Sequence, residues 1–145
     1  MASHLRIKPN LKPAIVITRV ALLANKLVYV ARANKAHRYR WGESHIVYIG
    51  TTKAGVHRIA GSAASKASML LGKWGIRQLE FYIVQSSKLQ NAETWRMLER
   101  ALLITFKEMF GDVPVANKQG KNMRWHQKGN YFREDKLRKA ITDFS

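Results

Sequence analysis

The sequence predicts an α+β fold with the element order β-β-α-β-α-α. Residues 27–33 and 45–51, each with a central tyrosine, have the alternating pattern of strands, and "LEFYIVQ", residues 79–85, has it a third time. Three other segments have the spacing of helices. A chain of 145 residues with 46% hydrophobic content suffices for one compact core, so we expect a single domain over residues 1–145.

The first two strands are expected to form a wide hairpin around the polar, basic loop "ANKAHRYRWGES". Side chains alternate between the two faces of a strand. Tyr29 in the first strand and Tyr48 in the second therefore both lie opposite their aliphatic neighbours. The two tyrosines are expected to share one face of the sheet.

The three helical segments are predicted from apolar spacing and from residues that favour helix ends. Thr51 or Thr52 could cap the first helix, which is rich in small residues. Asn91 is the expected N-cap of the second helix, and Gly111 is its expected end. The predicted helices cover residues 53–71, 91–111 and 133–144.

The region before the first strand, residues 1–26, is predicted to be a basic N-terminal extension. Residues 1–12 form a basic arm in this interpretation. Within residues 13–25, Pro13 suits the first position of a helix, whereas β-branched residues such as Ile15 favour a strand. We favour a helix here.

The charge of the chain points to a polyanionic partner. Lys and Arg number 26 against nine Asp and Glu, giving a formal net charge of +17, and such a body repels itself unless it meets nucleic acid. The apolar run "AIVITRVALLA" is interrupted by Arg19 and is too short to span a bilayer, and the first residues lack the pattern of a secretion signal. We therefore expect a cytoplasmic protein with no membrane partner. Without cysteine, a thiolate metal site is excluded.

One carboxylate of the long helix lies where an apolar side chain is expected. At roughly 100° per residue, Glu99 falls inside the apolar arc of the helix. A buried carboxylate is unfavourable without a cation or several donors, so Glu99 requires a partner such as a bound metal or an arginine. A Glu–Arg pair that only fixes packing is the alternative. The arc consists of Trp95, Leu98, Leu102, Leu103, Phe106, Met109 and Phe110.

A set of tyrosine, arginine, glutamate and asparagine side chains occurs in a characteristic order. The second tyrosine segment contains "YIG", with an arginine ten residues after its tyrosine, and the first tyrosine segment reads "LVY". In type and order these side chains resemble the GIY-YIG nuclease family over roughly residues 27–121, which implies a small three-stranded antiparallel sheet flanked by helices. Residues 122–145 then form a basic, aromatic C-terminal extension with a short helix. The residues that carry the resemblance are Tyr29, Tyr48, Arg58, Glu99 and Asn117.

The chain departs from the family pattern at two places. Leu27 and Val28 stand where family members usually have glycine and isoleucine, so the first motif keeps only its tyrosine. Ser62 stands four residues after the arginine, where many members have a histidine. These departures motivate a second hypothesis, a non-catalytic nucleic-acid-binding module on a decayed nuclease fold.

The resemblance implies an enzyme, an endonuclease that hydrolyses phosphodiester bonds with one Mg²⁺ or Mn²⁺ ion. Glu99 would hold this hard cation through its carboxylate oxygens, and Arg58 would grip phosphate oxygens in the transition state. Tyr29 would act as the general base or position the attacking water. Tyr48 would support that tyrosine or contact the scissile phosphate. Asn117 would orient the glutamate or a strand by hydrogen bonding.

Other basic and aromatic residues are candidates for contacts to the substrate, with DNA as the leading partner and RNA as the alternative. Cations neutralise phosphates, and aromatic faces stack on unpaired bases. The aromatic side chains near the C-terminus could instead pack the last helix onto the core. The candidate contacts are Lys35, Arg38, Arg40, Lys53, Lys118, Lys121, Arg124, Trp125 and Lys128.

The biological role stays open among restriction, intron homing, repair and phage functions, which implies a bacterial or phage-like protein. Members of the family usually join the nuclease fold to a recognition domain, for which this chain has little room. Loops, the N-terminal arm or a partner would then select the target, and a dimer would allow two strands to be cut. A basic ribosome-associated or membrane-surface protein is a third hypothesis.

Overall fold

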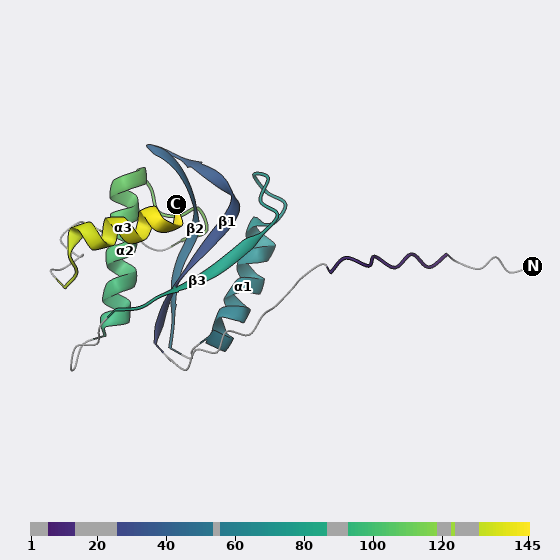
Figure 1. The fold of residues 1–145 in the computed structure, drawn as a ribbon, viewed down its shortest axis with the longest axis horizontal. Helices are drawn as coiled ribbons and strands as arrows, with labels where there is room; N and C mark the ends of the chain where they lie inside the picture. The colour runs from purple at the N-terminus through teal and green to yellow at the C-terminus, as the bar shows by residue number, and fades with distance from the viewer. Residues whose placement is uncertain (1–5, 14–25, 54–55, 87–92, 119–122, 124–130) are drawn as a thin grey trace, which may run out of the picture.

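The computed structural model has an α+β fold in the predicted order β-β-α-β-α-α (Figure 1). It describes residues 6–13, 26–53, 56–86, 93–118, 123 and 131–145, with the backbone alone for residues 56–58 and 60. The strands are β1 (Leu27–Tyr39), β2 (Gly42–Thr52) and β3 (Leu79–Val84), and the helices are α1 (Val56–Leu70), α2 (Thr94–Phe110) and α3 (Glu134–Phe144). The sheet is three-stranded and antiparallel in the order β2-β1-β3, which confirms the predicted fold class.

The hairpin of β1 and β2 is longer and its turn tighter than the sequence predicted. The polar segment expected as a wide loop belongs largely to the strands, which a turn at Arg40 and Trp41 connects. Burial of Tyr39 explains the extension, because this residue is only 7% exposed and its hydroxyl donates to the Ile46 carbonyl oxygen at 2.7 Å. Exposed basic side chains are compatible with a strand that faces water. The prediction of a wide loop was therefore wrong.

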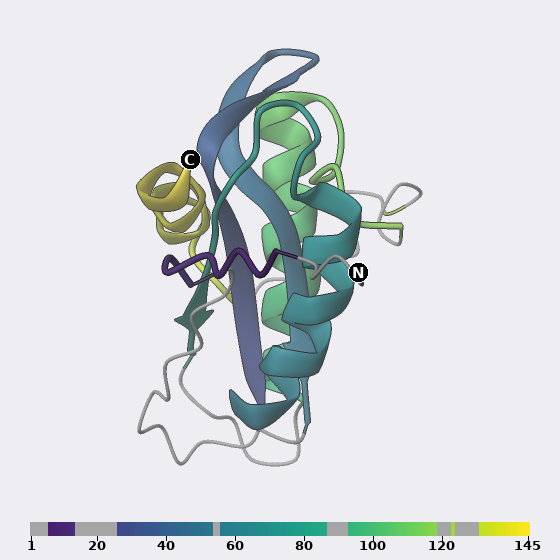
Figure 2. The ribbon, with the colours of Figure 1, turned by 90° about the vertical axis from the view of Figure 1, so that its right-hand side faces the viewer.

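Helices cover both faces of the sheet (Figure 2). Val28 and Val30 of β1 pack with apolar side chains of α2 and α3, including most of the arc predicted for the long helix. Ala31 and Ala33 pack on the opposite face with Leu70, at the end of α1. Alternation along β1 thus divides the core into two layers.

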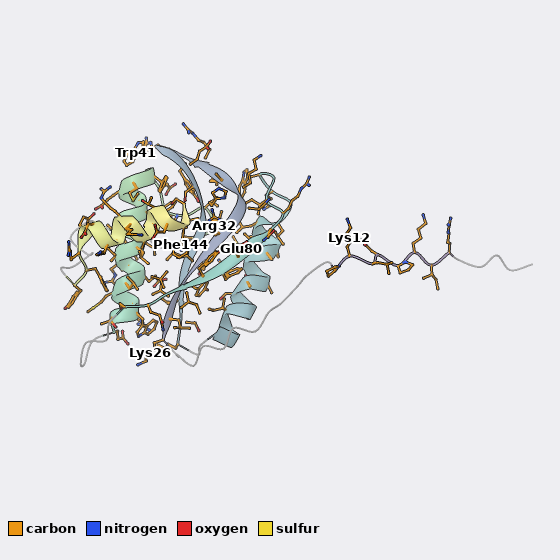
Figure 3. The ribbon with its side chains drawn as sticks, viewed as in Figure 1. Lys12, Lys26, Arg32, Trp41, Glu80 and Phe144 are labelled. Carbon is orange, nitrogen blue, oxygen red and sulfur yellow. The ribbon has the colours of Figure 1, made fainter. Side chains whose placement is uncertain are left out.

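The C-terminal helix α3 packs onto the sheet instead of standing apart from it. Leu137 and Ile141 are buried in the core cluster that α2 and the strands share. At its end, the Arg32 Nε atom donates to the Phe144 carbonyl oxygen at 3.0 Å, and Figure 3 shows these two residues close together. A cation at the C-terminal end of a helix also interacts favourably with the negative end of the helix dipole.

The C-terminal end of α2 is tied to the hairpin turn. Gly111 has the left-handed φ of 87° at the predicted end of the helix, and its N–H donates to the Lys107 carbonyl oxygen at 2.8 Å. A Cβ atom at Gly111 would lie 2.8 Å from the Cβ of Arg40 and 3.0 Å from Cδ2 of Trp41. The Trp41 N–H also donates to the Phe110 carbonyl oxygen at 3.1 Å. Glycine is therefore required for both the backbone conformation and the close approach.

Some predictions fall outside the described residues. They are the helix over residues 13–25, of which only Pro13 is described, and Asn91 as N-cap. The described part of the second helix has Glu93 at the position before Thr94. Residues 6–13 are exposed and contain no helix or strand. Within the described ranges, no helix is both long and apolar enough to cross a membrane.

Gly111→Ala is expected to lower the free energy of unfolding by at least about 2 kcal/mol, because alanine resists the left-handed conformation and its Cβ collides with the turn. Gly61→Ala is the matched control, since a Cβ there meets nothing within 4 Å on α1. It should stabilise the protein by up to about 1 kcal/mol. Urea unfolding monitored by circular dichroism measures both changes, and equal effects would contradict the role of Gly111.

Candidate active site

The two predicted tyrosines lie together on one face of the hairpin. Tyr29 of β1 is paired in register with Gly50 of β2, and Tyr48 is paired with Ala31. The ring centroids of the tyrosines are 5.8 Å apart, with an interplanar angle of 44°. Tyr29 is 1% exposed, whereas Tyr48 is partly exposed and gives the pair its access to solvent.

Gly50 provides the space that the two rings occupy. A Cβ atom at Gly50 would lie 2.6 Å from Cε1 of Tyr48 and 2.9 Å from both Cζ and Oη of Tyr29. These distances are too short for any side chain, so a larger residue would push the rings apart. The "YIG" sequence therefore has a steric reason in this chain, independent of any family resemblance.

Tyr48 remains a protonated phenol at neutral pH. Burial raises its pKa well above the ordinary value, and the neighbouring Tyr29 and the carboxylate of Glu99 raise it further. The phenol can therefore donate a hydrogen bond to an anionic oxygen, but it does not serve as a base without additional positive charge.

Glu99 extends from α2 toward the end of β2. Its side chain is partly buried, and the Thr51 hydroxyl donates a long hydrogen bond to Oε2 at 3.5 Å. Burial raises the pKa of Glu99, while the Thr51 hydroxyl, Arg100 and Arg96 oppose that shift. The carboxylate thus lies in a place that a bound cation would stabilise.

Asn117 pairs with the outer edge of β2, and none of the contacts described joins it to Glu99. The Ile49 N–H donates to its Oδ1 at 2.9 Å, and its Nδ2 donates to the Ile49 carbonyl oxygen at 2.8 Å. The adjacent Ala116 N–H donates to the Val47 carbonyl oxygen at 2.9 Å. The sequence suggested that Asn117 orients either Glu99 or a strand, and these hydrogen bonds join it to a strand.

Lys66 of α1 also belongs to this site, although it is not among the residues predicted from the sequence. Its Nζ lies 4.3 Å from the centroid of the Tyr48 ring, within cation–π range, and donates to the Ala116 carbonyl oxygen at 3.4 Å. Burial lowers the pKa of Lys66, and the nearby Lys118 lowers it further. Its spacing from Arg58 and Ser62, four residues at each step, was the available signal.

The structure brings together some of the predicted site residues and leaves others outside its description. The tyrosines, Glu99 and Asn117 surround the end of β2. Arg58 lies on α1, of which only the backbone is described at that position. The predicted contacts that are described and exposed are Lys35, Arg38, Arg40, Lys53 and Lys118, whereas Lys121, Arg124, Trp125 and Lys128 lie outside the described residues.

A metal at this site would depend on one carboxylate. The part of the chain that the structure describes contains no group of three or more His, Cys, Asp or Glu side chains that could hold a metal ion. Mg²⁺ fits such a place, because it retains several waters and takes only one or two protein carboxylates. Glu99 and the neighbouring Thr51 hydroxyl supply hard oxygen donors of the required kind.

Comparisons with known proteins identify no relative. No protein-family model, no curated protein and no solved structure matches this chain. Function must therefore be argued from the arrangement of the side chains.

Asn117→Ala is expected to lower the free energy of unfolding by about 2–4 kcal/mol, because it leaves the buried N–H and C=O groups of Ile49 without partners. Lys118→Ala, at the exposed neighbouring position, should change it by less than about 0.5 kcal/mol. Denaturant titration distinguishes them, and a neutral Asn117→Ala would refute the edge-closing role.

Glu99→Gln is expected to stabilise the metal-free protein at about pH 7 but not at about pH 4. Because burial raises the pKa of Glu99 above its ordinary 4.5, the folded state holds the proton more tightly than the unfolded chain, and ionisation weakens the fold as the pH rises through this range. Glu108→Gln, at an exposed position of the same helix, is the control.

Urea unfolding with a chelator present, at both pH values, measures the difference. A Glu99→Gln variant less stable than wild type at the higher pH would show that ionised Glu99 stabilises packing, as the Glu–Arg alternative requires.

Proposed function

We propose that this protein is a metal-dependent endonuclease that hydrolyses phosphodiester bonds of DNA. The observation that carries the proposal is the closure of the Tyr29 and Tyr48 rings over Gly50, beside a partly buried Glu99 on another element. The resemblance to the GIY-YIG nucleases assigns these four positions to one reaction. The net charge of +17 suits a polyanionic substrate.

Charge stabilisation in this proposal comes from Glu99 and from the cations of α1. Glu99 would hold Mg²⁺ or Mn²⁺, which when bound supplies polarisation of the phosphate and stabilisation of the leaving oxygen. Arg58 would neutralise phosphate oxygens from the neighbouring helix. Lys66, already beside the Tyr48 ring, adds positive charge on the same side.

The two tyrosines take different parts. Tyr48, whose pKa is raised, donates a hydrogen bond to a non-bridging phosphate oxygen. Tyr29 would orient the attacking water or accept its proton, for which Arg58 and a metal held by Glu99 would supply the required positive charge. Asn117 acts through β2 as a positioning residue, because it fixes the strand on which Tyr48 and Gly50 lie.

A non-catalytic nucleic-acid-binding module is the second candidate, and one observation favours it. Leu27 and Val28, which replace the glycine and isoleucine of the family's first motif, are 0% exposed and serve the core. In this chain, the two residues before Tyr29 therefore pack in the core. This candidate predicts salt-sensitive DNA binding with no cleavage and no dependence on divalent metal.

The test is incubation of the purified protein with plasmid, oligonucleotides and structured RNA in the presence of Mg²⁺ or Mn²⁺. Wild type should cleave DNA, chelation should abolish cleavage, and Glu99→Gln should lower the rate at least about a hundredfold. Glu108→Gln should cleave like wild type. Because Glu99→Gln is expected to remain folded, its loss of cleavage is not due to unfolding.

Identical products from wild type and Glu99→Gln, or no cleavage of any substrate, would exclude the enzyme. Salt-sensitive binding without cleavage would then support the second candidate.

A further inference from the structure

The loop between α1 and β3 presents an aromatic side chain that the proposed site does not use. Trp74 lies in the loop between α1 and β3 and is 52% exposed. Its φ is 51°, the only positive value of a non-glycine residue in the described ranges. A bulky side chain is strained in this conformation. Because the indole is also half exposed, packing in the core does not account for a tryptophan at this position.

The loop that carries Trp74 is held firmly against β1. Asn34 accepts hydrogen bonds at Oδ1 from the N–H groups of Arg77 and Gln78, at 2.9 and 3.1 Å. The Asn34 N–H in turn donates to the Gln78 carbonyl oxygen at 3.1 Å. Within the loop, the Gly72 N–H donates to the carbonyl oxygen of Ile76, which is buried. A ligand would therefore meet a preorganised surface.

Trp74 is backed by a second aromatic ring and surrounded by cations. The centroids of Trp74 and His37 are 5.1 Å apart in an edge-to-face arrangement, and His37 contacts Tyr39 in the same way at 4.8 Å. The Lys35 side chain lies across Gly75, where a Cβ atom would be 3.0 Å from its Cδ. Two exposed acids lie nearby: Glu43 pairs with Arg38, and Asp112 lines a pocket with Arg38 and Arg40. The exposed cations on this loop and the adjoining hairpin end are Lys35, Arg38, Arg40, Lys73 and Arg77.

A half-exposed indole within a cluster of cations suits one ligand chemistry. Phosphates are neutralised by lysine and arginine, whereas an indole face binds a base only when that base is free of its own stack. In blunt duplex DNA the bases are stacked on one another. The indole therefore adds affinity for single-stranded segments and little for a continuous duplex.

We propose that Trp74, with His37 behind it, is a stacking site for an unpaired base of single-stranded DNA. This deepens the proposed nuclease function, on which it rests, by assigning a substrate that contains a single-stranded segment. His37 is six residues beyond Ala31, the partner of Tyr48, along β1. β1 has a register shift between these residues, and along β2 the matching separation, from Ser44 to Tyr48, is four residues or roughly 13 Å.

Two variants of similar size separate stacking from bulk. Trp74→Phe keeps an aromatic face, whereas Trp74→Leu keeps only apolar volume, and both place a side chain at the same left-handed position. Fluorescence anisotropy in a chelator measures binding of labelled single-stranded DNA about 20 nucleotides long and of the matching blunt duplex.

Trp74→Leu should weaken single-strand binding about tenfold and duplex binding less than about twofold, while Trp74→Phe stays near wild type on both. Photocrosslinking of a 5-bromouracil-substituted single strand should label Trp74.

Equal single-strand affinities of the leucine and phenylalanine variants would overturn the stacking site. If wild type still cleaves DNA in a metal-dependent way, only this inference fails. If wild type binds no DNA at all, the proposed nuclease function fails with it.

Discussion

Closure of the β2 edge by Asn117 is the constraint on which the candidate site depends. β2 is an edge strand, and without a partner its Ile49 backbone would be free to move or to pair with another chain. The amide of Asn117 satisfies both backbone groups of Ile49, and this fixes the residues on either side. Tyr48 and Thr51 then project to opposite faces of the same strand, toward Tyr29 and Glu99 respectively. The site thus surrounds the end of one strand instead of lying on one face of the sheet.

Several residues have side chains or conformations that lower the stability of the fold, and a role in binding or chemistry explains them. A partly buried carboxylate with a raised pKa weakens the fold at neutral pH, and an apolar side chain at Glu99 would continue the arc of α2. Gly50 has no side chain to pack, and this leaves room for two phenols to approach each other. Trp74 adopts a conformation that glycine would adopt more easily. Residues that disagree with their local environment are expected at sites of binding or chemistry.

The fold was largely predictable from sequence because its signals are local. Alternation defined the strands and 3.6-residue spacing defined the helices, and Gly111 ended α2 where its left-handed preference indicated. The hairpin loop was misjudged, because basic side chains on a solvent-facing strand look like a loop when the burial of Tyr39 is not visible. Tyr29 and Tyr48 could be placed on one face by parity alone. The contacts of Lys66 and Asn117 depend on segments distant in sequence, which no local pattern encodes.

The position of a bound metal and phosphate tests the convergence of these side chains most directly. A crystal structure with Mn²⁺ and a short single-stranded oligonucleotide, in which anomalous scattering locates the metal, would measure it. We expect Mn²⁺ on the Glu99 carboxylate and a phosphate within hydrogen-bonding distance of the Tyr48 hydroxyl, with no metal there in Glu99→Gln. Mn²⁺ bound away from Glu99, or a phosphate backbone that does not reach the tyrosine pair, would contradict the assignment of this site.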